Sequence, residues 1–409
     1  MAIVVQKFGG TSVATPDLVR RAAGRAIRAT QGGHNVVVVV SARGQTTDEL
    51  LDLAYEITDH PNPRELDQLV STGEQISIAL VAMAIHAAGH GAISFTGGQV
   101  GLVTDAVHTK ARIQHVNSQR IYDEFAKGNI VIIAGFQGVD ANQNVTTLGR
   151  GGSDTTAVAL AAALKADVCE IYTDVDGVFT ADPRLVPTAR KLDEITYDEM
   201  LELASLGAGV LHSRAVEFGK KYHIPIHVRS SLTENPGTMI VEEVSRMETI
   251  TVRGAALVRD LAKVTIRGVP DQPGVAARIF HAIAAANVVV DDIIQNISRQ
   301  GAADVSFTVA KDELATAMDT SRRIAQELGA GDVVADDKVS KVSVVGIGMR
   351  SHTGVAQRMF KALAEAGVNI QMISTSEIKI SCIIDRGSAD KALRVVHDAF
   401  GLGEGAGPG

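Results

Sequence analysis

The stretch Gly149-Arg150-Gly151-Gly152-Ser153-Asp154, with the apolar run 155–166 behind it, decides the fold. Glycines let the backbone turn tightly and bring amide donors close to a ligand, and Ser153 or Asp154 is expected to cap the following helix. The positive end of such a helix attracts anions, and an arginine can grip a carboxylate or phosphate with two hydrogen bonds. The stretch predicts either an anion-binding loop or a well-capped core helix with a solvated arginine.

The composition is that of a globular protein with more than one domain. The chain has 409 residues, 45% of them hydrophobic and 21% charged, so about two or three domains are expected. The net charge of −8 argues against nucleic acid or an anionic membrane as the main partner. Cys169 and Cys382 lie far apart in apolar segments, which favours free thiols in a reducing cytoplasm. No signal pattern or long apolar span is found, so no membrane insertion is expected.

The N-terminal segment reads as a strand, a glycine turn and a helix. The strand Met1 to Val5 leads into Lys7-Phe8-Gly9-Gly10-Thr11-Ser12, and Pro16 opens an amphipathic helix that ends near Gly32. A lysine beside paired glycines at the exit of a strand can neutralise a phosphate, although a surface lysine is the simpler interpretation. The lysine precedes the glycines, so this is not a Walker A loop.

Two helix starts follow a strand of five valines, Val36 to Val40, which is typical of a strand buried on both faces. The strand delivers Ser41 at its carboxyl end, where ligands gather in parallel sheets. Thr46 and Glu49 have the spacing of a capping box, which leaves Thr47 free to bind. Ser71 and Glu74 have the same spacing, so Glu74 is either a helix cap or a ligand-binding group.

The next segments continue this alternation. Residues 93–116 are expected to form turns that could cover a site, and the isolated His108 and His115 are expected to lie on the surface. Strands are expected over 130–134 and 167–173, the second ending in a cluster from Thr173 to Arg184. Its aspartates could hold magnesium, accept ribose hydroxyls or merely make turns. Strands that alternate with helices and deliver polar residues at their carboxyl ends predict an α/β sandwich with one ligand crevice.

Four motifs in this order resemble the signature segments of aspartate kinases: 7–12, 71–74, 149–155 and 173–184. The resemblance covers nearly the whole chain. It implies the amino acid kinase fold, a largely parallel sheet sandwiched by helices, over residues 1–245. It also implies transfer of the ATP γ-phosphoryl group to the side-chain carboxylate of L-aspartate, the committed step toward lysine, threonine and methionine.

The same resemblance assigns roles to individual residues. Lys7 would sit over the transferring phosphoryl group and Asp154 would orient it, in a reaction that depends on positioning and charge neutralisation. Arg150 would grip a substrate carboxylate, Glu74 would meet the substrate ammonium, and Thr47 would orient the reacting end. Mg²⁺ would be held mainly by the ATP phosphates and water rather than by protein ligands. The nucleotide would be lined by Lys7, Gly9, Gly10, Ser41, Thr173, Asp174, Phe179, Asp182 and Arg184.

One position departs from the family pattern. Where many aspartate kinases have a lysine that reaches the ATP phosphates, this chain has Gly209 in the stretch 207–212. We therefore expect Lys7, Arg184 or Arg214 to carry more of the nucleotide charge, and a lysine at position 209 to lower the KM for ATP.

The last third of the chain contains an internal repeat. Residues 263–269 are matched by 341–347, each followed by a loop, a helix with Phe280 or Phe360 in register, and an apolar strand. This pattern resembles a pair of ferredoxin-like ACT domains, with repeats near 263–335 and 341–400 in a regulatory region 246–400. The glycine-rich residues 401–409 are expected to form a flexible tail.

The resemblance implies that lysine, threonine or both bind the ACT repeats as feedback inhibitors; dimerisation alone is the other interpretation of the repeats. It also implies a homo-oligomer formed through the ACT domains, and a separate regulatory chain that starts at Met247. The expected effector-binding residues are Asp271, Pro273, Gly274, Val275, Ala276, Gln295, Asn296, Ser374, Thr375, Ser376 and Glu377.

Two other functions remain open at this point. One is a kinase of the same fold for another small carboxylate or nucleotide, although such chains usually lack a paired sensor tail. The other is an amino-acid sensor that kept ATP affinity and lost catalysis, for which glycine at position 209 is the only support.

Overall fold

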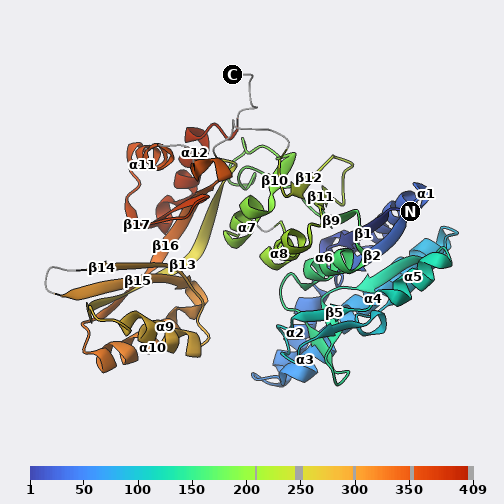
Figure 1. Cartoon of the computed structure of the whole chain (residues 1–409), viewed down its shortest axis with the longest axis horizontal. Helices are drawn as coiled ribbons and strands as arrows, with labels where there is room; N and C mark the ends of the chain where they lie inside the picture. Colours follow the sequence, from blue (N-terminus) through green and yellow to red (C-terminus); the bar gives the residue numbers. More distant parts are fainter. Residues whose placement is uncertain (208–209, 245–251, 298–300, 351–353, 404–409) are drawn as a thin grey trace. The chain divides into compact units, whose positions relative to one another are not determined.

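The computed structural model describes residues 1–207, 210–244, 252–297, 301–350 and 354–403. Among these residues the chain forms two compact units (Figure 1). The first contains residues 1–179, 191–205 and 210–244, and the second contains residues 180–190, 206–207 and 252–403. Gly209 and Met247, on which two expectations depend, lie outside the described residues.

The first unit is built on an eight-stranded sheet. Six neighbouring strands, β11, β9, β1, β2, β6 and β3, run parallel to one another. Strand β12 runs antiparallel to its neighbour β11. The valine run forms β2 in the middle of the sheet, where it is buried on both faces as expected. In spatial order the strands are β10 (Glu194–Thr196), β12 (Thr238–Val241), β11 (Ile226–Ser230), β9 (Val168–Thr173), β1 (Ile3–Phe8), β2 (Asn35–Val40), β6 (Ile130–Ala134) and β3 (Ala92–Phe95).

Helices cover both faces of this sheet (Figure 1). Helices α1 and α4 form one core with the side chains of Val36, Val38 and Val40. Helix α6 packs against β1, β2 and β9, and its residues 157–164 are apolar on every side, as expected for a helix buried between the sheet and α8. The helices are α1 (Pro16–Gln31), α2 (Thr46–Ile57), α3 (Pro63–Val70), α4 (Thr72–Ala87), α5 (Gln119–Ala126), α6 (Gly152–Leu164), α7 (Tyr197–Ser205) and α8 (Ser213–Tyr222).

The segment 93–116, expected to form turns, contributes two strands, β4 (Leu102–Thr104) and β5 (Ile113–Val116), to a second, four-stranded sheet. This sheet consists of β5, β4, β7 (Gln137–Val139) and β8 (Val145–Thr147) in spatial order. These strands are only three or four residues long. Such short strands are hard to read from periodicity because each shows barely one alternation of buried and exposed positions.

The segment Pro63–Ala87 is long and apolar enough to span a membrane by length and composition. Half of its most apolar window is buried inside the protein. It consists of the two helices α3 and α4, and it carries the buried carboxyl groups of Asp67 and Glu74. Helix α4, the longer part of this segment, packs against α1 and the sheet and therefore belongs to the hydrophobic core.

The second unit contains a six-stranded antiparallel sheet built from the two repeats. Two long strands, β13 and β16, pair with each other and join the repeats within one chain. Its strands in spatial order are β14 (Val290–Ile297), β15 (Ala302–Ala310), β13 (Gly254–Pro270), β16 (Val333–Val345), β18 (Lys379–Asp385) and β17 (Ile370–Thr375). Its helices are α9 (Val275–Ala285), α10 (Leu314–Leu328), α11 (Val355–Glu365) and α12 (Ala389–Ala399).

The two repeats have separate cores. Phe280 and Phe360 occupy equivalent places on α9 and α11, and each packs against the core of its own repeat. The beginning of β13 belongs to the second core, since Ala255 packs there with Val342 and Val344. The first repeat is therefore inserted between two parts of the second, which the sequence comparison of the repeats did not indicate.

The segment Thr180–Arg190 leaves the first unit and packs in the second. Ala181 and Val186 are buried in the core of the second repeat. The Thr180 hydroxyl lies 3.0 Å from Nε2 of the buried His397, and the Thr180 carbonyl accepts from the backbone N–H of Ala255. Burial lowers the pKa of His397, which favours the neutral imidazole there. A single boundary near residue 245 therefore does not describe the packing of this segment.

Candidate active site

The carboxyl ends of the parallel strands meet at one edge of the large sheet. Phe8 pairs with Val40 on one side and with Tyr172 on the other, and Thr173 pairs with Ser230. The residues that follow these strands are therefore neighbours in space although they are far apart in sequence. Ligands of open α/β sheets bind at this edge.

Lys7 and Asp154 form a buried ion pair at this edge. The Lys7 ammonium lies 2.6 Å from Oδ1 of Asp154, and the two side chains are only 11% and 12% exposed. Lys7 is the penultimate residue of β1, and Asp154 lies in the first turn of α6. The alternative of a surface lysine is excluded by this burial. A fixed ammonium group beside a helix N-terminus can attract an anion such as phosphate.

The glycine turn after β1 lies against the loop after β2. A Cβ atom at Gly10 would lie 2.7 Å from the Ala42 carbonyl oxygen, a distance that side-chain carbon atoms do not reach. The Gly10 carbonyl also accepts from the backbone N–H of Gly44. At Gly9, a Cβ would lie 3.5 Å from the Lys7 ammonium. Only glycine at position 10 allows the two loops, including Ser41, to approach this closely.

Glu74 reaches the same pair of loops instead of capping its helix. Its Oε1 accepts from the backbone N–H of Ala42 at 3.0 Å, and Ser71 makes no side-chain capping bond. Of the two interpretations left open for Glu74, the helix cap is excluded. The capping box expected at Thr46 is wrong, because Gln45 precedes α2 and makes no side-chain capping bond. Thr47 lies in the first turn of α2 and is half-buried.

The Glu74 carboxyl group is buried, and burial changes its ionisation. It is 3% exposed, and burial raises its pKa from 4.5 to about 7 although the Ala42 bond opposes the rise. Its second oxygen, Oε2, is buried and has no hydrogen-bond partner among the described residues. A buried oxygen without a partner is costly, and an ammonium group of a ligand would satisfy it.

Arg150 lies exposed between two glycines with left-handed backbones. Gly149 has φ = 77° and Gly151 has φ = 71°. A Cβ at Gly151 would lie 2.3 Å from the Cβ of His212, so glycine is required there on two grounds. Gly151 itself precedes α6, and Ser153 and Asp154 lie inside the helix. The expectation that one of these two residues caps α6 is wrong, which leaves the Asp154 carboxylate available to Lys7.

Asp67 is a buried residue near this loop that the sequence did not single out. Its carboxylate accepts from the Thr147 hydroxyl at 2.5 Å and from the Thr109 backbone N–H at 3.0 Å, and it lies 2.8 Å from Nδ1 of His108. It thereby fixes the loop 105–111, whose Thr109 carbonyl lies against Gly149. The expectation that His108 is an isolated surface residue is wrong. The sequence signal that could have identified Asp67 is a charged residue on the face of α3 that is buried.

The expected nucleotide-lining residues fall into two groups. Thr173, Asp174 and Phe179 belong to the first unit, and the Thr173 hydroxyl donates to Asp174. Asp182 and Arg184 belong to the second unit, where they pair with each other at 2.8 Å. This pairing lowers the pKa of the Asp182 carboxyl. Their contact with a nucleotide stays a prediction.

The expected effector residues lie on matching parts of the two repeats. Asp271, Pro273 and Gly274 are exposed on the loop before α9, and Val275 and Ala276 begin that helix. Gly274 and its counterpart Gly354 both have left-handed backbones, with φ of 90° and 95°. Gln295 and Asn296 lie exposed on β14, and Ser374 to Glu377 lie at the end of β17 and just beyond it.

A buried ion pair connects the two repeats beside these residues. Lys341 on β16 is 1% exposed and pairs with the carboxylates of Asp291 and Asp292 on β14. Asp292 also accepts from the Ser374 hydroxyl on β17. The strands that carry the two sets of expected effector residues are thus joined directly through Asp292.

Comparison with known proteins identifies the architecture. Residues 2–230 match the amino acid kinase family, and residues 264–324 and 342–400 each match the ACT domain. An aspartate kinase from Stutzerimonas stutzeri is 54% identical over 408 residues, which cover 100% of this chain and 99% of the relative. The predicted fold class is confirmed by these matches.

Solved structures agree with the sequence relatives. The crystal structure of Escherichia coli aspartokinase III with aspartate and ADP (R-state) has a TM-score of 0.82 at 26% identity and covers 97% of this chain and 99% of that chain. The same enzyme with lysine and aspartate (T-state) has a TM-score of 0.76 at 27% identity, with the same coverage. From its two ACT domains, its amino acid kinase domain and its full-length relatives, the chain belongs to the aspartate kinase family.

Proposed function

We propose that the protein transfers the γ-phosphoryl group of ATP to the side-chain carboxylate of L-aspartate, forming 4-phospho-L-aspartate and ADP. The observation that carries the proposal is the buried Lys7–Asp154 pair at the carboxyl edge of the sheet. Oε2 of Glu74, for which the described part of the chain offers no hydrogen-bond partner, lies in the same unit. A phosphate needs a fixed cation, and an amino acid needs a carboxylate for its ammonium group. Membership of the aspartate kinase family, with a relative crystallised with aspartate and ADP, supports the choice of substrates.

In the proposed mechanism a carboxylate oxygen of aspartate attacks the γ-phosphorus while the bond to the β-γ bridging oxygen breaks. No covalent enzyme intermediate is needed, so the protein contributes position and charge. Lys7 neutralises the negative charge on the moving phosphoryl group, and Asp154 holds Lys7 in place. Glu74 binds the substrate ammonium, Arg150 binds a substrate carboxylate, and Thr47 orients the reacting end.

We expect Mg²⁺ to be held by the ATP phosphates and by water rather than by protein ligands. Among the described residues there is no group of three or more His, Cys, Asp or Glu side chains that could hold a metal ion. An ion bound by the ATP phosphates and by water needs no such group, and it neutralises phosphate charge when bound.

Regulation by lysine, threonine or both is part of the proposal. The expected effector residues lie on the exposed loop before α9, at the start of α9, and on or just beyond the strands β14 and β17. Asp292 connects these two strands. The relative crystallised with lysine supports an amino-acid effector. A homo-oligomer formed through the ACT domains, a regulatory chain starting at Met247 and a cytoplasmic location stay predictions.

A coupled assay of ADP release tests the function. We expect release that depends strictly on L-aspartate, with little from L-glutamate or without an acceptor, and inhibition by lysine, threonine or the pair. Release with another acceptor but not with aspartate would refute the substrate, and no release with any acceptor would favour a sensor. Full activity in the presence of both amino acids would refute the regulatory part alone.

A further inference from the structure

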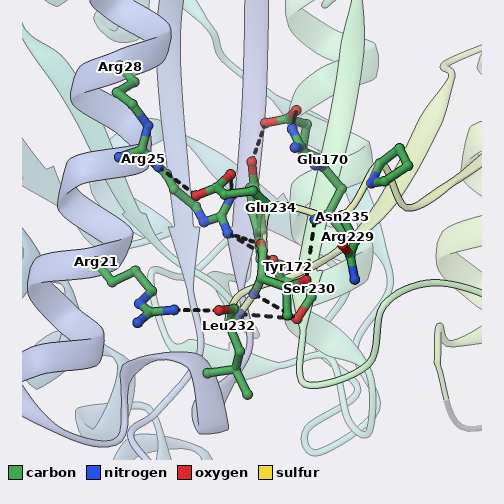
Figure 2. Close-up of polar contacts among 12 residues, drawn as sticks. Arg21, Arg25, Arg28, Glu170, Tyr172, Arg229, Ser230, Leu232, Glu234 and Asn235 are labelled. Carbon is green, nitrogen blue, oxygen red and sulfur yellow. Dashed lines mark hydrogen bonds and ion pairs between the residues drawn. The ribbon is translucent and has the colours of Figure 1, made fainter.

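Three arginines on one face of α1 hold the loop that follows β11. Arg21, Arg25 and Arg28 are spaced by four and three residues, so they lie on one side of the helix (Figure 2). Arg21 donates to the Leu232 carbonyl at 2.6 Å, and Arg28 pairs with Glu234 at 3.3 Å. The loop 230–234 is therefore bound along its length by one helix.

Arg25 is the central and buried member of this group. Its side chain is 4% exposed and donates to the carbonyls of Ser230 and Thr233 at 3.1 and 2.5 Å and to the carboxylate of Glu234 at 3.1 Å (Figure 2). The guanidinium also lies 4.7 Å from the centre of the Tyr172 ring. A buried charge is tolerated only when such partners compensate for lost water, and the planar fork of arginine suits two carbonyls at once.

The loop reaches the segment expected to line the nucleotide. The backbone N–H of Ser231 donates to the Thr173 carbonyl at 2.7 Å. The Asp176 carboxylate accepts from the Thr233 hydroxyl at 2.6 Å and from the Asn235 amide at 2.9 Å. Tyr172, which Arg25 covers, directly precedes Thr173. Arg25 thus contacts both the loop and the strand end from which the residues 173–176 emerge.

We propose that Arg25 is a positioning residue for the nucleotide: it holds the loop 230–234 against the 173–176 segment and so sets the affinity for ATP without touching either substrate. The proposal rests on the proposed function and on the expectation, from the resemblance to aspartate kinases, that Thr173 and Asp174 line the nucleotide. It adds a residue of α1 that the motifs in the sequence do not include.

The test compares Arg25→Met with Arg20→Met in the full-length protein. Methionine keeps an unbranched side chain over Tyr172 but loses every hydrogen bond. Arg20 lies on the same helix, is exposed, and pairs with Asp17. We expect Arg25→Met to raise the KM for ATP and the Kd for ADP about tenfold, which corresponds to about 1.4 kcal/mol. The KM for aspartate should stay within about twofold, Arg20→Met should behave as the wild type, and Arg25→Lys should recover part of the affinity.

Equal rises in both KM values, or unchanged ATP and ADP affinity in a folded Arg25→Met protein, would overturn the proposal. If Arg25→Met does not fold, the exposed Arg21→Met decides: an approximately twofold to threefold rise in the KM for ATP alone supports the proposal, and no rise overturns it. Wild-type ADP release with aspartate tests the proposed function separately. ADP affinity remains measurable even if aspartate is not the acceptor.

Discussion

Replacing Glu74 by glutamine should weaken the capture of aspartate and remove its pH dependence near neutrality. Because burial raises the pKa of Glu74 to about 7, only about a tenth of the free protein carries this carboxylate at pH 6 and about nine-tenths at pH 8. In the wild type, kcat/KM for aspartate should therefore fall nearly tenfold from pH 8 to pH 6. At pH 8 Glu74→Gln should lower kcat/KM roughly thirtyfold, since uncharging one partner of a buried pair costs about 2 kcal/mol or more.

The same substitution has a stability readout that needs no substrate. A carboxyl group whose pKa is raised by folding contributes stability that is fully present below its unfolded pKa of 4.5 and lost as the pH rises through about 7. Raising the pKa by this amount corresponds to about 3 kcal/mol, an order-of-magnitude value. Glutamine keeps the acceptor for the Ala42 N–H and never ionises. Thermal melting should therefore show Glu74→Gln gaining stability over the wild type at pH 8 but not at pH 4.5.

Glu65→Gln is the matched control, because Glu65 is exposed on the preceding helix and pairs with Arg64. It should leave both the kinetics and the stability unchanged. The reasoning would be refuted if Glu74→Gln kept wild-type kcat/KM at pH 8, or if the pH dependence near 7 persisted in its profile. A rise in the KM for ATP equal to that for aspartate would also refute the assignment of Glu74 to the ammonium group.

Three further substitutions test other parts of the structure. Asp154→Asn should lower kcat about a hundredfold in steady-state assays, because Lys7 loses its buried partner; an unchanged kcat would count against that role. Gly151→Ala should destabilise the protein by more than about 2 kcal/mol in urea unfolding, because φ is 71° and the new Cβ meets His212; equal stability would contradict the described turn. Lys341→Met should lower the unfolding midpoint by leaving the Asp292 carboxylate without its cation at a cost of about 3–5 kcal/mol, whereas the exposed Lys338→Met should not.

Periodicity and glycine placement were sufficient to predict the α/β class and the internal repeat. Val36 to Val40 can be buried on both faces only in the interior of a parallel sheet, and that is where β2 lies. The lysine before Gly9 lies at the carboxyl edge of the sheet because it stands near the end of the parallel strand β1. The glycines around Arg150 lie at this edge because they directly precede helix α6. Local chemistry thus located the candidate site along the chain.

Local rules failed where a distant segment competed for the same side chain. Glu74 has the spacing of a helix cap, but the Ala42 backbone takes its carboxylate. Asp67 and His108 are 41 residues apart and unremarkable alone, and they pair only because α3 meets the loop 105–111. The segment 180–190 follows a strand of the first unit, yet its apolar side chains complete the core of the second. Each of these partners lies far away in the sequence, beyond the short stretch that a local rule considers.

The sequence by itself determined the longer strands and helices, the internal repeat, the glycine turns and the residues available for chemistry, because these depend on short-range backbone preferences and on hydrophobic periodicity. Only the tertiary structure decided which charged groups are buried and with what partner. Among the described residues, Lys7 is paired with Asp154, Glu74 has a buried oxygen without a hydrogen-bond partner, and Arg25 supports a loop 205 residues away in sequence. Burial and pairing are properties of segments brought together by packing, so they set the electrostatics of the site only after the chain has folded.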